Sequence, residues 1–101
     1  MQDFDQILEE LRKFRSSRNW EQFHDPKNLA EAISIEAGEL LEHFLWKSVD
    51  ESRSLPEVER KEVAQELADI LIFLIYMSTE LEIDLPGAVA VSYTHLTLPT
   101  N

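Results

Sequence analysis

Eight consecutive apolar residues, Ile70 to Met77, constrain the fold of this chain more than any other stretch. A helix that is apolar on every side is normally buried on every side. The run is far too short to span a bilayer, so we expect no membrane around it. Because a chain of 101 residues buries only about two-thirds of its unfolded surface, a helix enclosed in this way calls for a partner chain.

Apolar periodicity marks a helix at the start of the chain. Phe4, Ile7, Leu8, Leu11 and Phe14 recur at three- and four-residue intervals, which predicts an amphipathic helix over residues 3–16. A loop rich in aromatic and hydrogen-bonding side chains follows, over residues 16–27. Loops of this composition often bind ligands.

Three start signals place the remaining helices. Asp25-Pro26 pairs a capping residue with a first-turn proline, Ser54-Leu-Pro-Glu57 resembles a capping box, and Asp84-Leu-Pro86 repeats the first signal. They predict helices over residues 26–47 and 54–80, and a fourth helix that begins Gly87-Ala-Val-Ala-Val after the Asp84-Leu-Pro86 signal. The linker Ser48 to Arg53 is polar and short enough to make the second and third helices antiparallel. We therefore expect an all-α fold, a four-helix bundle that dimerisation completes.

The last ten residues differ from the rest of the chain. Residues 92–101 are rich in threonine, contain no Asp, Glu, Lys or Arg, and show no helical period. Such residues favour extended or irregular backbone. We therefore assign residues 1–91 to one domain and expect residues 92–101 to be a non-native or disordered tail.

Composition excludes several classes of function. Acidic residues outnumber basic ones 20 to 9, for a formal charge of −11, so a nucleic-acid polymer is not an expected ligand, although a small phosphate ester screened by metal ions is compatible with this charge. The absence of cysteine removes disulfides and thiolate metal sites. The N-terminus does not have the pattern of a signal peptide, and we expect a cytoplasmic protein.

Two acidic pairs are the candidate chemical centre. Glu36-Ala-Gly-Glu39 lies on the second predicted helix and Glu66-Leu-Ala-Asp69 on the third. A three-residue step returns to nearly the same helix face, so each pair directs two carboxylates one way. Carboxylate oxygens are the ligands that Mg²⁺ prefers, and Mg²⁺ commonly bridges them to substrate phosphates. We expect Glu36, Glu39, Glu66 and Asp69 to bind Mg²⁺, with Mn²⁺ as a possible substitute.

Two other interpretations of the acidic pairs stay open. In a chain this acidic, pairs at three-residue spacing also arise on solvated helix faces. A carboxylate-bridged di-iron site is the other metal alternative, but it requires Glu-x-x-His, and Glu39 and His43 are four residues apart. His43 is therefore expected to be a surface or packing residue.

Aromatic residues flank the helix that carries the first acidic pair. Trp20 precedes it, and Trp46 closes it beside Lys47. Tryptophans at helix ends often serve only packing, and a histidine such as His24 in the preceding loop is as consistent with a structural hydrogen bond as with a ligand contact. Flat aromatic faces also stack on nucleobases, so an aromatic wall near a carboxylate–metal cluster suits a nucleoside triphosphate.

Six short blocks follow one another between residues 18 and 86: Arg18-Asn-Trp-Glu-Gln-Phe-His24, Pro26-Lys-Asn-Leu29, Glu36-Ala-Gly-Glu-Leu40, Phe44-Leu-Trp-Lys47, Glu66-Leu-Ala-Asp-Ile-Leu-Ile72 and Asp84-Leu-Pro86. In this order they resemble the MazG-type nucleoside triphosphate pyrophosphohydrolases. The similarity covers about residues 4–90 and is greatest to the small single-domain branch that includes the dCTP pyrophosphatases.

This resemblance implies a MazG-like all-α dimer, or a tetramer of two dimers, with active sites shared between subunits. It implies Mg²⁺-dependent hydrolysis of a (deoxy)nucleoside triphosphate, with dCTP-like substrates, to the monophosphate and pyrophosphate, as in house-cleaning of the nucleotide pool. Glu36, Glu39, Glu66 and Asp69 match the magnesium ligands, and one of them, Glu39 being a candidate, would orient or deprotonate the attacking water. The resemblance implies that four residues of these blocks wall the nucleotide pocket: Trp20, His24, Trp46 and Lys47. It implies a fifth substrate-binding position at Phe73, where close relatives have a tyrosine near the sugar or base.

The chain departs from the resemblance at its end. Relatives continue the fourth helix into a basic segment that helps to hold the phosphates, and residues 92–101 contain none of it. Lys47, Arg15 and Arg18 are the nearby cations that could substitute in part, and activity is expected to be impaired if nothing replaces the segment. A non-catalytic helical dimer that binds nucleotide or a protein partner is therefore the alternative function.

Overall fold

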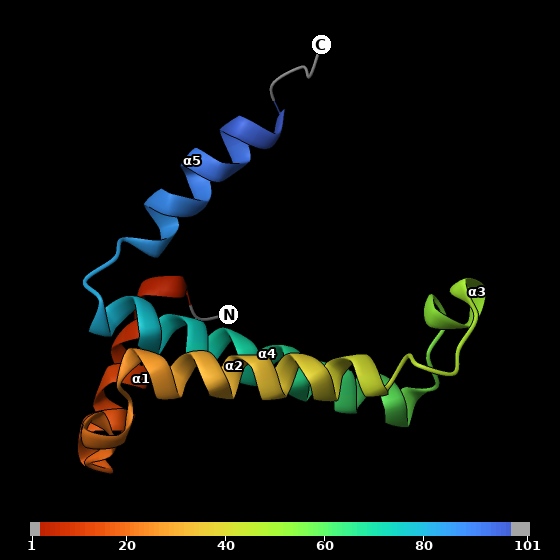
Figure 1. Ribbon diagram of the computed structural model, residues 1–101, viewed down its shortest axis with the longest axis horizontal. Helices are drawn as coiled ribbons and strands as arrows, with labels where there is room; N and C mark the ends of the chain where they lie inside the picture. The colour runs from red at the N-terminus through yellow and green to blue at the C-terminus, as the bar shows by residue number, and fades with distance from the viewer. Residues whose placement is uncertain (1–2, 98–101) are drawn as a thin grey trace.

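The computed structural model describes residues 3–97, and every regular element in that range is helical (Figure 1). The elements are, in chain order, α1 (Phe4–Ser17), the 3₁₀ helix η1 (Trp20–Phe23), α2 (Pro26–Glu42), α3 (Val49–Ser52), α4 (Glu57–Glu80) and α5 (Leu85–Thr97). The prediction of an all-α fold is confirmed. None of the described helices has the length and apolar character that crossing a membrane requires.

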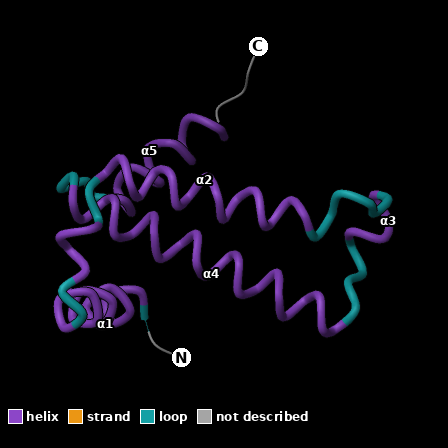
Figure 2. Tube along the Cα trace, turned by 60° about the horizontal axis from the view of Figure 1, so that its bottom comes forward, coloured by secondary structure: helices purple, strands orange, loops and turns teal. Residues whose placement is uncertain are grey.

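α2 and α4 form an antiparallel pair that is the body of the molecule. Figure 2 shows them side by side, joined through the short α3. α1 crosses one end of this pair on the α4 side, and α5 leaves the end of α4 and projects away from the other helices (Figure 1). The buried apolar residues in the described part of the chain are Leu29 of α2 and Ile75 and Tyr76 of α4.

Three helices begin where the sequence places a capping aspartate. The side chains of Asp3, Asp25 and Asp84 each accept a hydrogen bond from the backbone N–H three residues later. Each cap satisfies one of the N–H groups that have no partner within the helix. The predicted start signals of α2 and α5 are therefore confirmed, although α5 begins at Leu85 rather than at Gly87.

The predicted end of α2 is wrong. α2 ends at Glu42 rather than at residue 47, because the backbone N–H groups of His43, Phe44 and Lys47 bond to carbonyls three residues back. The predicted polar linker contains the short helix α3. Ser48 caps α3, and the side chain of Glu51 accepts from the Ser48 backbone N–H in return.

The predicted capping box at Ser54 does not form. α4 begins at Glu57, and its N-cap position is Pro56, which provides no side-chain hydrogen bond. The capping pattern of Ser followed three residues later by Glu occurs twice within ten residues of this chain, and the structure uses the copy that begins at Ser48.

The C-terminal segment is more regular than its composition suggests. α5 runs through Thr97, so residues 92–97 are helical rather than disordered. The hydroxyl of Thr94 donates to the carbonyl of Ala90 one turn earlier, which pairs a side chain that would otherwise disfavour the helix. Residues 98–101 lie outside the described residues, and the non-native origin of residues 92–101 stays a prediction.

The four long helices do not close into a bundle within one chain. α5 makes few contacts with the other elements, and Leu67, Leu71 and Leu74 of α4 form an exposed apolar stripe. The radius of gyration is 16.3 Å, whereas a compact domain of this length has about 13 Å. The apolar run that begins at Ile70 is thus only partly enclosed by its own chain.

Candidate active site

Three of the four predicted metal ligands meet where α2 faces α4. Glu36, Glu39 and Glu66 each offer one carboxylate oxygen, and these three oxygens lie within 4.8 Å of one another. The three-residue step from Glu36 to Glu39 puts both on one face of α2, and the antiparallel packing brings Glu66 of α4 opposite them. Glu36 and Glu66 are half-buried, whereas Glu39 is exposed.

Asp69 lies beside Glu36 rather than within the cluster of three oxygens. It follows Glu66 by one turn of α4, and its side chain lines the same cavity as Glu36. Asp69 is therefore a neighbour of Glu36 outside the cluster of Glu36, Glu39 and Glu66, and we refer to the four carboxylates together as the acidic row.

The row is electrostatically unbalanced without a cation. Hydrogen bonding to Glu66, burial, and the negative charges of Glu66 and Asp69 raise the pKa of Glu36 above its ordinary value, and a hydrogen bond with Glu39 offsets only part of this. One buried oxygen of Glu36 and one of Glu66 accept no hydrogen bond from any described residue. Converging carboxylates with unpaired, buried oxygens fit a hard divalent cation such as Mg²⁺.

An apolar cavity of about 320 Å³ opens beside the carboxylates. Glu36 and Asp69 form its acidic part. The remaining lining residues are aromatic or aliphatic: Leu11, Phe14, Trp20, Ile72, Phe73 and Tyr76. A concave apolar site with a few polar groups at one place is typical of small-molecule binding, and flat rings in its wall suit a nucleobase.

The aromatic side chains around this cavity contact one another. The Trp20 ring meets Phe14 edge-on at 5.1 Å between centroids, and it meets His24 at 5.9 Å. His24 in turn stacks on Tyr76 at 5.1 Å with an interplanar angle of 29°. His24 is half-buried behind the wall, so it supports the rings that line the cavity.

A local backbone feature places Trp20. α1 ends at Ser17, and Asn19 takes a left-handed conformation with φ of 57° before η1 begins. Asparagine is one of the few residue types that adopts this conformation readily. The resulting turn brings Trp20 back against Phe14 of α1.

Of the five predicted substrate-binding residues, Trp20 and Phe73 line the cavity and His24 adjoins it. Trp46 and Lys47 lie elsewhere in this chain. Trp46 follows α2 at the end opposite η1 and is 94% exposed, and the Lys47 Nζ lies 2.6 Å from a Glu59 carboxylate oxygen.

Sequence reasoning did not identify four lining residues: Leu11, Phe14, Ile72 and Tyr76. Their apolar character indicated core packing, and only the crossing of α1 over α4 turns them toward a cavity. The one available signal was Tyr76, the residue with a hydroxyl in an otherwise apolar run.

Arg15 is placed differently from expectation, whereas His43 is half-buried, as a packing residue would be. Arg15 was a candidate for phosphate binding, but it is buried and its Nη1 donates to Glu80 Oε1 at 2.8 Å. His43 lies at the edge of the carboxylate row, with Nε2 4.0 Å from Glu66 Oε1, which is too long for a hydrogen bond.

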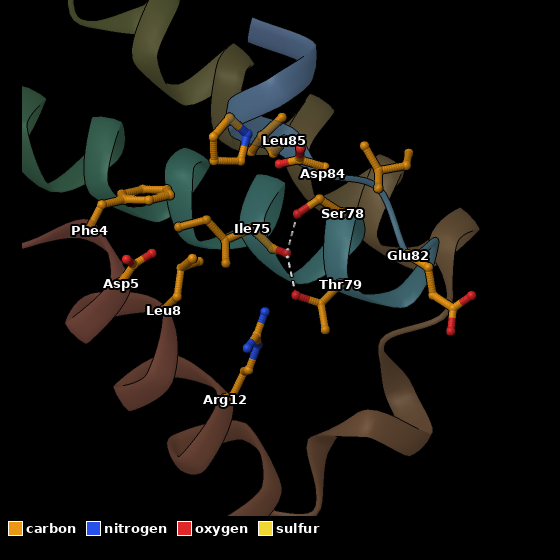
Figure 3. Close-up of a pocket in the computed structure, with 12 residues that line it drawn as sticks. Phe4, Asp5, Leu8, Arg12, Ile75, Ser78, Thr79, Glu82, Asp84 and Leu85 are labelled. Atoms are coloured by element: carbon orange, nitrogen blue, oxygen red, sulfur yellow. Dashed lines mark hydrogen bonds between the residues drawn. The ribbon is translucent and has the colours of Figure 1, made fainter. Parts of the chain in front are cut away.

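A second cavity, of about 400 Å³, lies between α1 and the turn from α4 to α5 (Figure 3). The hydroxyls of Ser78 and Thr79 in its wall both donate to the carbonyl of Ile75, so they are engaged within α4. None of the clustered carboxylates lines this cavity, and we do not assign it to the candidate active site.

Comparison with known proteins agrees with this geometry. The sequence pattern of the MazG-like family matches residues 31–91, a segment that includes all four acidic residues of the row. The chain belongs to the MazG-like family. As a MazG-like protein it is similar to dCTP pyrophosphatase 1 of Mus musculus, with 43% identity over 88 residues, and to that of Homo sapiens, with 41% over 88 residues. Each match covers 81% of this chain and 52% of the relative, so the chain spans about half the length of these curated relatives.

The MazG-like fold is also found in a solved relative. A pyrophosphatase from Archaeoglobus fulgidus superposes with a TM-score of 0.84 and 40% sequence identity, over 99% of this chain and 95% of the other. The similarity to the dCTP pyrophosphatase branch predicted from the sequence blocks is confirmed.

Proposed function

We propose that this MazG-like chain hydrolyses a (deoxy)nucleoside triphosphate, with dCTP-like substrates the first candidates, to the monophosphate and pyrophosphate in the presence of Mg²⁺ or Mn²⁺. The observation that carries the proposal is the position of Glu36. Its carboxylate belongs both to the cluster with Glu39 and Glu66 and to the lining of the aromatic cavity. A ligand with its base in the cavity would therefore have its phosphates beside the acidic row.

The buried oxygens of Glu36 and Glu66 are the ones that would hold the cation, with Glu39 and Asp69 beside them. When bound, Mg²⁺ supplies positive charge that offsets the phosphate oxygens and makes a water a stronger nucleophile. Glu39 is the exposed member of the cluster and is the candidate to accept a proton from that water. The oxygen of the water then bonds to the α-phosphorus of the triphosphate. At the same time the bond between the α-phosphorus and the oxygen that bridges it to the β-phosphorus breaks, and pyrophosphate leaves with that oxygen.

We further propose that two copies complete the enzyme. A partner that covers Leu67, Leu71 and Leu74 would remove an exposed apolar stripe from water. Trp46 and Lys47 do not line the cavity of their own chain: Trp46 is 94% exposed, and Lys47 pairs with Glu59. In a dimer they are placed to serve the partner's nucleotide.

The test is pyrophosphate release from a panel of ribo- and deoxynucleoside triphosphates, measured with Mg²⁺, with Mn²⁺ and with chelator. We expect metal-dependent release that is abolished in Glu36→Gln and unchanged in Glu31→Gln, an exposed acid on the same helix. Nucleotide binding without release from any triphosphate would favour the non-catalytic alternative. Release that persists in chelator or in Glu36→Gln would contradict the proposal.

A further inference from the structure

We propose that Arg15 is a positioning residue for the nucleotide cavity. It holds the ring of Tyr76, and through Tyr76 that of His24, in the wall against which the base would stack. It therefore raises nucleotide affinity without touching the nucleotide. This inference rests on the proposed function of the cavity.

The burial of Arg15 requires an explanation. Its exposed fraction is 6%, and among the charged residues that the structure describes no other is buried. Its Nη1 donates at 2.8 Å to Oε1 of Glu80, which lies 65 residues away on α4. The Arg15 side chain is 8% exposed and that of Glu80 is 28% exposed, and a partly buried ion pair contributes little net stability, so stability alone explains the burial of Arg15 poorly. The pair does fix the position of the guanidinium relative to α4.

The fixed guanidinium is in contact with an aromatic ring. The Arg15 Cζ lies 5.2 Å from the centroid of the Tyr76 ring, within the range of a cation–π interaction. The Tyr76 hydroxyl donates to the carbonyl of Leu11 at 3.2 Å. The ring is thus held by two contacts from α1, one to its face and one to its hydroxyl. A planar guanidinium can donate to a carboxylate from its edge while its face lies over a ring, whereas a lysine ammonium has no flat face to stack.

Tyr76 transmits this restraint to the cavity. Its ring lines the cavity directly, and it stacks on His24, which contacts Trp20 within the segment that follows the chain reversal at Asn19. Two rings, those of Tyr76 and His24, therefore lie between Arg15 and the wall residue Trp20. A looser Tyr76 would leave the wall with more conformations to lose when a base binds, which lowers affinity.

The experiment compares Arg15→Lys and Arg15→Met with Arg12→Met, which removes an exposed arginine one turn earlier on α1. Arg15→Lys keeps a positive charge for Glu80 but loses the planar contact with Tyr76. Four properties are measured: the melting temperature, the dissociation constant for dCTP from tryptophan fluorescence, kcat and KM for dCTP with Mg²⁺, and Mn²⁺ affinity by calorimetry.

We expect Arg15→Lys to fold and to weaken dCTP binding and raise KM by about 2- to 30-fold, the range that loss of a cation–π contact implies. We expect kcat and Mn²⁺ affinity to stay within about twofold of wild type, and Arg12→Met to match wild type throughout. Glu80→Gln is expected to show the same pattern in weaker form.

Several results would overturn the positioning role. One is that Arg15→Lys and Glu80→Gln, as separate variants, both fold and both bind dCTP with unchanged affinity. Arg15 would then be a purely structural residue. Another is a parallel loss of Mn²⁺ affinity and kcat, which would indicate general damage. If Arg15→Met fails to fold, the other two variants decide. A wild-type chain that binds dCTP without turnover would overturn the proposed activity alone, because the binding measurement still tests Arg15.

Discussion

Glu36 of α2 and Glu66 of α4 bring carboxylate oxygens within 4.8 Å of each other across the helix pair, and each keeps a buried oxygen without a hydrogen-bond donor among the described residues. Two like charges in this position oppose the packing of α2 on α4 unless a proton or a cation lies between them. The same pair thus links the stability of the hairpin to the proposed metal site.

Metal should stabilise the folded chain through this pair. Addition of Mg²⁺ at about 100 times its dissociation constant adds roughly 2.7 kcal/mol to the free energy of unfolding, because only the folded chain brings the carboxylates together. Glu66→Gln removes one of the two opposed charges, so we expect a higher melting temperature without metal and a smaller increase with Mg²⁺. Differential scanning calorimetry measures both, with Glu31→Gln as the control. If Mg²⁺ raises the melting temperature of Glu66→Gln as much as that of wild type, the cation does not bind at this pair.

Trp20, not Trp46, should report nucleotide binding within one chain. Trp20 lines the aromatic cavity, whereas Trp46 is 94% exposed at the other end of α2. Trp20→Ala should weaken dCTP binding by roughly 1–3 kcal/mol, or about 5- to 150-fold, since the stacking surface is lost. Fluorescence quenching in Trp46→Phe follows Trp20 alone. If Trp46→Phe also weakens binding, and does so only in the oligomer, Trp46 serves the partner's nucleotide.

Alkaline pH should destabilise the chain through Tyr76. Burial raises the pKa of Tyr76 above its ordinary value of 10.0, and the charge of Arg15 only partly opposes this. Because the folded-state pKa is the higher one, the contribution to stability is fully present below about pH 10 and is lost as pH rises through the folded-state pKa. Tyr76→Phe should remove this part of the pH dependence.

Tyr76→Phe should also lower the stability of the chain at neutral pH, which Tyr93→Phe should not. Loss of the hydroxyl that donates to Leu11 should lower the free energy of unfolding at neutral pH by about 0.5–1.5 kcal/mol. Tyr93→Phe is the control, because Tyr93 is exposed on α5. Urea unfolding at pH 7 and above pH 10 measures both effects. If the free energy of unfolding of Tyr76→Phe falls above pH 10 as much as that of wild type, groups other than Tyr76 cause the loss of stability at alkaline pH.

The exposed stripe on α4 should control self-association. Leu71→Glu places a charge between Leu67 and Leu74, which a partner could cover only with a large desolvation cost. We expect wild type to sediment as a dimer or tetramer and Leu71→Glu as a monomer. Lys61→Glu, at a position already occupied by an exposed charged residue, should not change the mass. A monomeric wild type would remove the proposed role of Trp46 in a partner's site.

The two glycines offer a test of how closely a partner approaches α2. A Cβ at Gly38 would meet no atom within 4 Å, so Gly38→Ala should stabilise an isolated chain by about 0.8–1.0 kcal/mol through helix propensity. A Cβ at Gly87 would collide with the Asp84 cap, so Gly87→Ala should destabilise α5. Thermal melts at several concentrations compare the two. Destabilisation by Gly38→Ala that grows with oligomer formation would place a partner against this turn of α2.

The sequence by itself determined what depends on neighbours along the chain. Asp25 and Asp84 cap helices because a side-chain oxygen reaches an N–H three residues away, and Glu36 and Glu39 share a face because of the helical repeat. Where two local signals competed, at Ser48 and Ser54, the sequence did not show which one the chain uses.

Tertiary structure decided what depends on distant segments. The acidic row needs α2 against α4, and the cavity needs α1 across α4. Arg15 reads in the sequence as a surface cation of an amphipathic helix, yet it is buried against Glu80, 65 residues away. Tyr76 reads as core, yet it lines the cavity. No local rule predicts such contacts, because their energies arise from burial and charge pairing that exist only once the helices have packed.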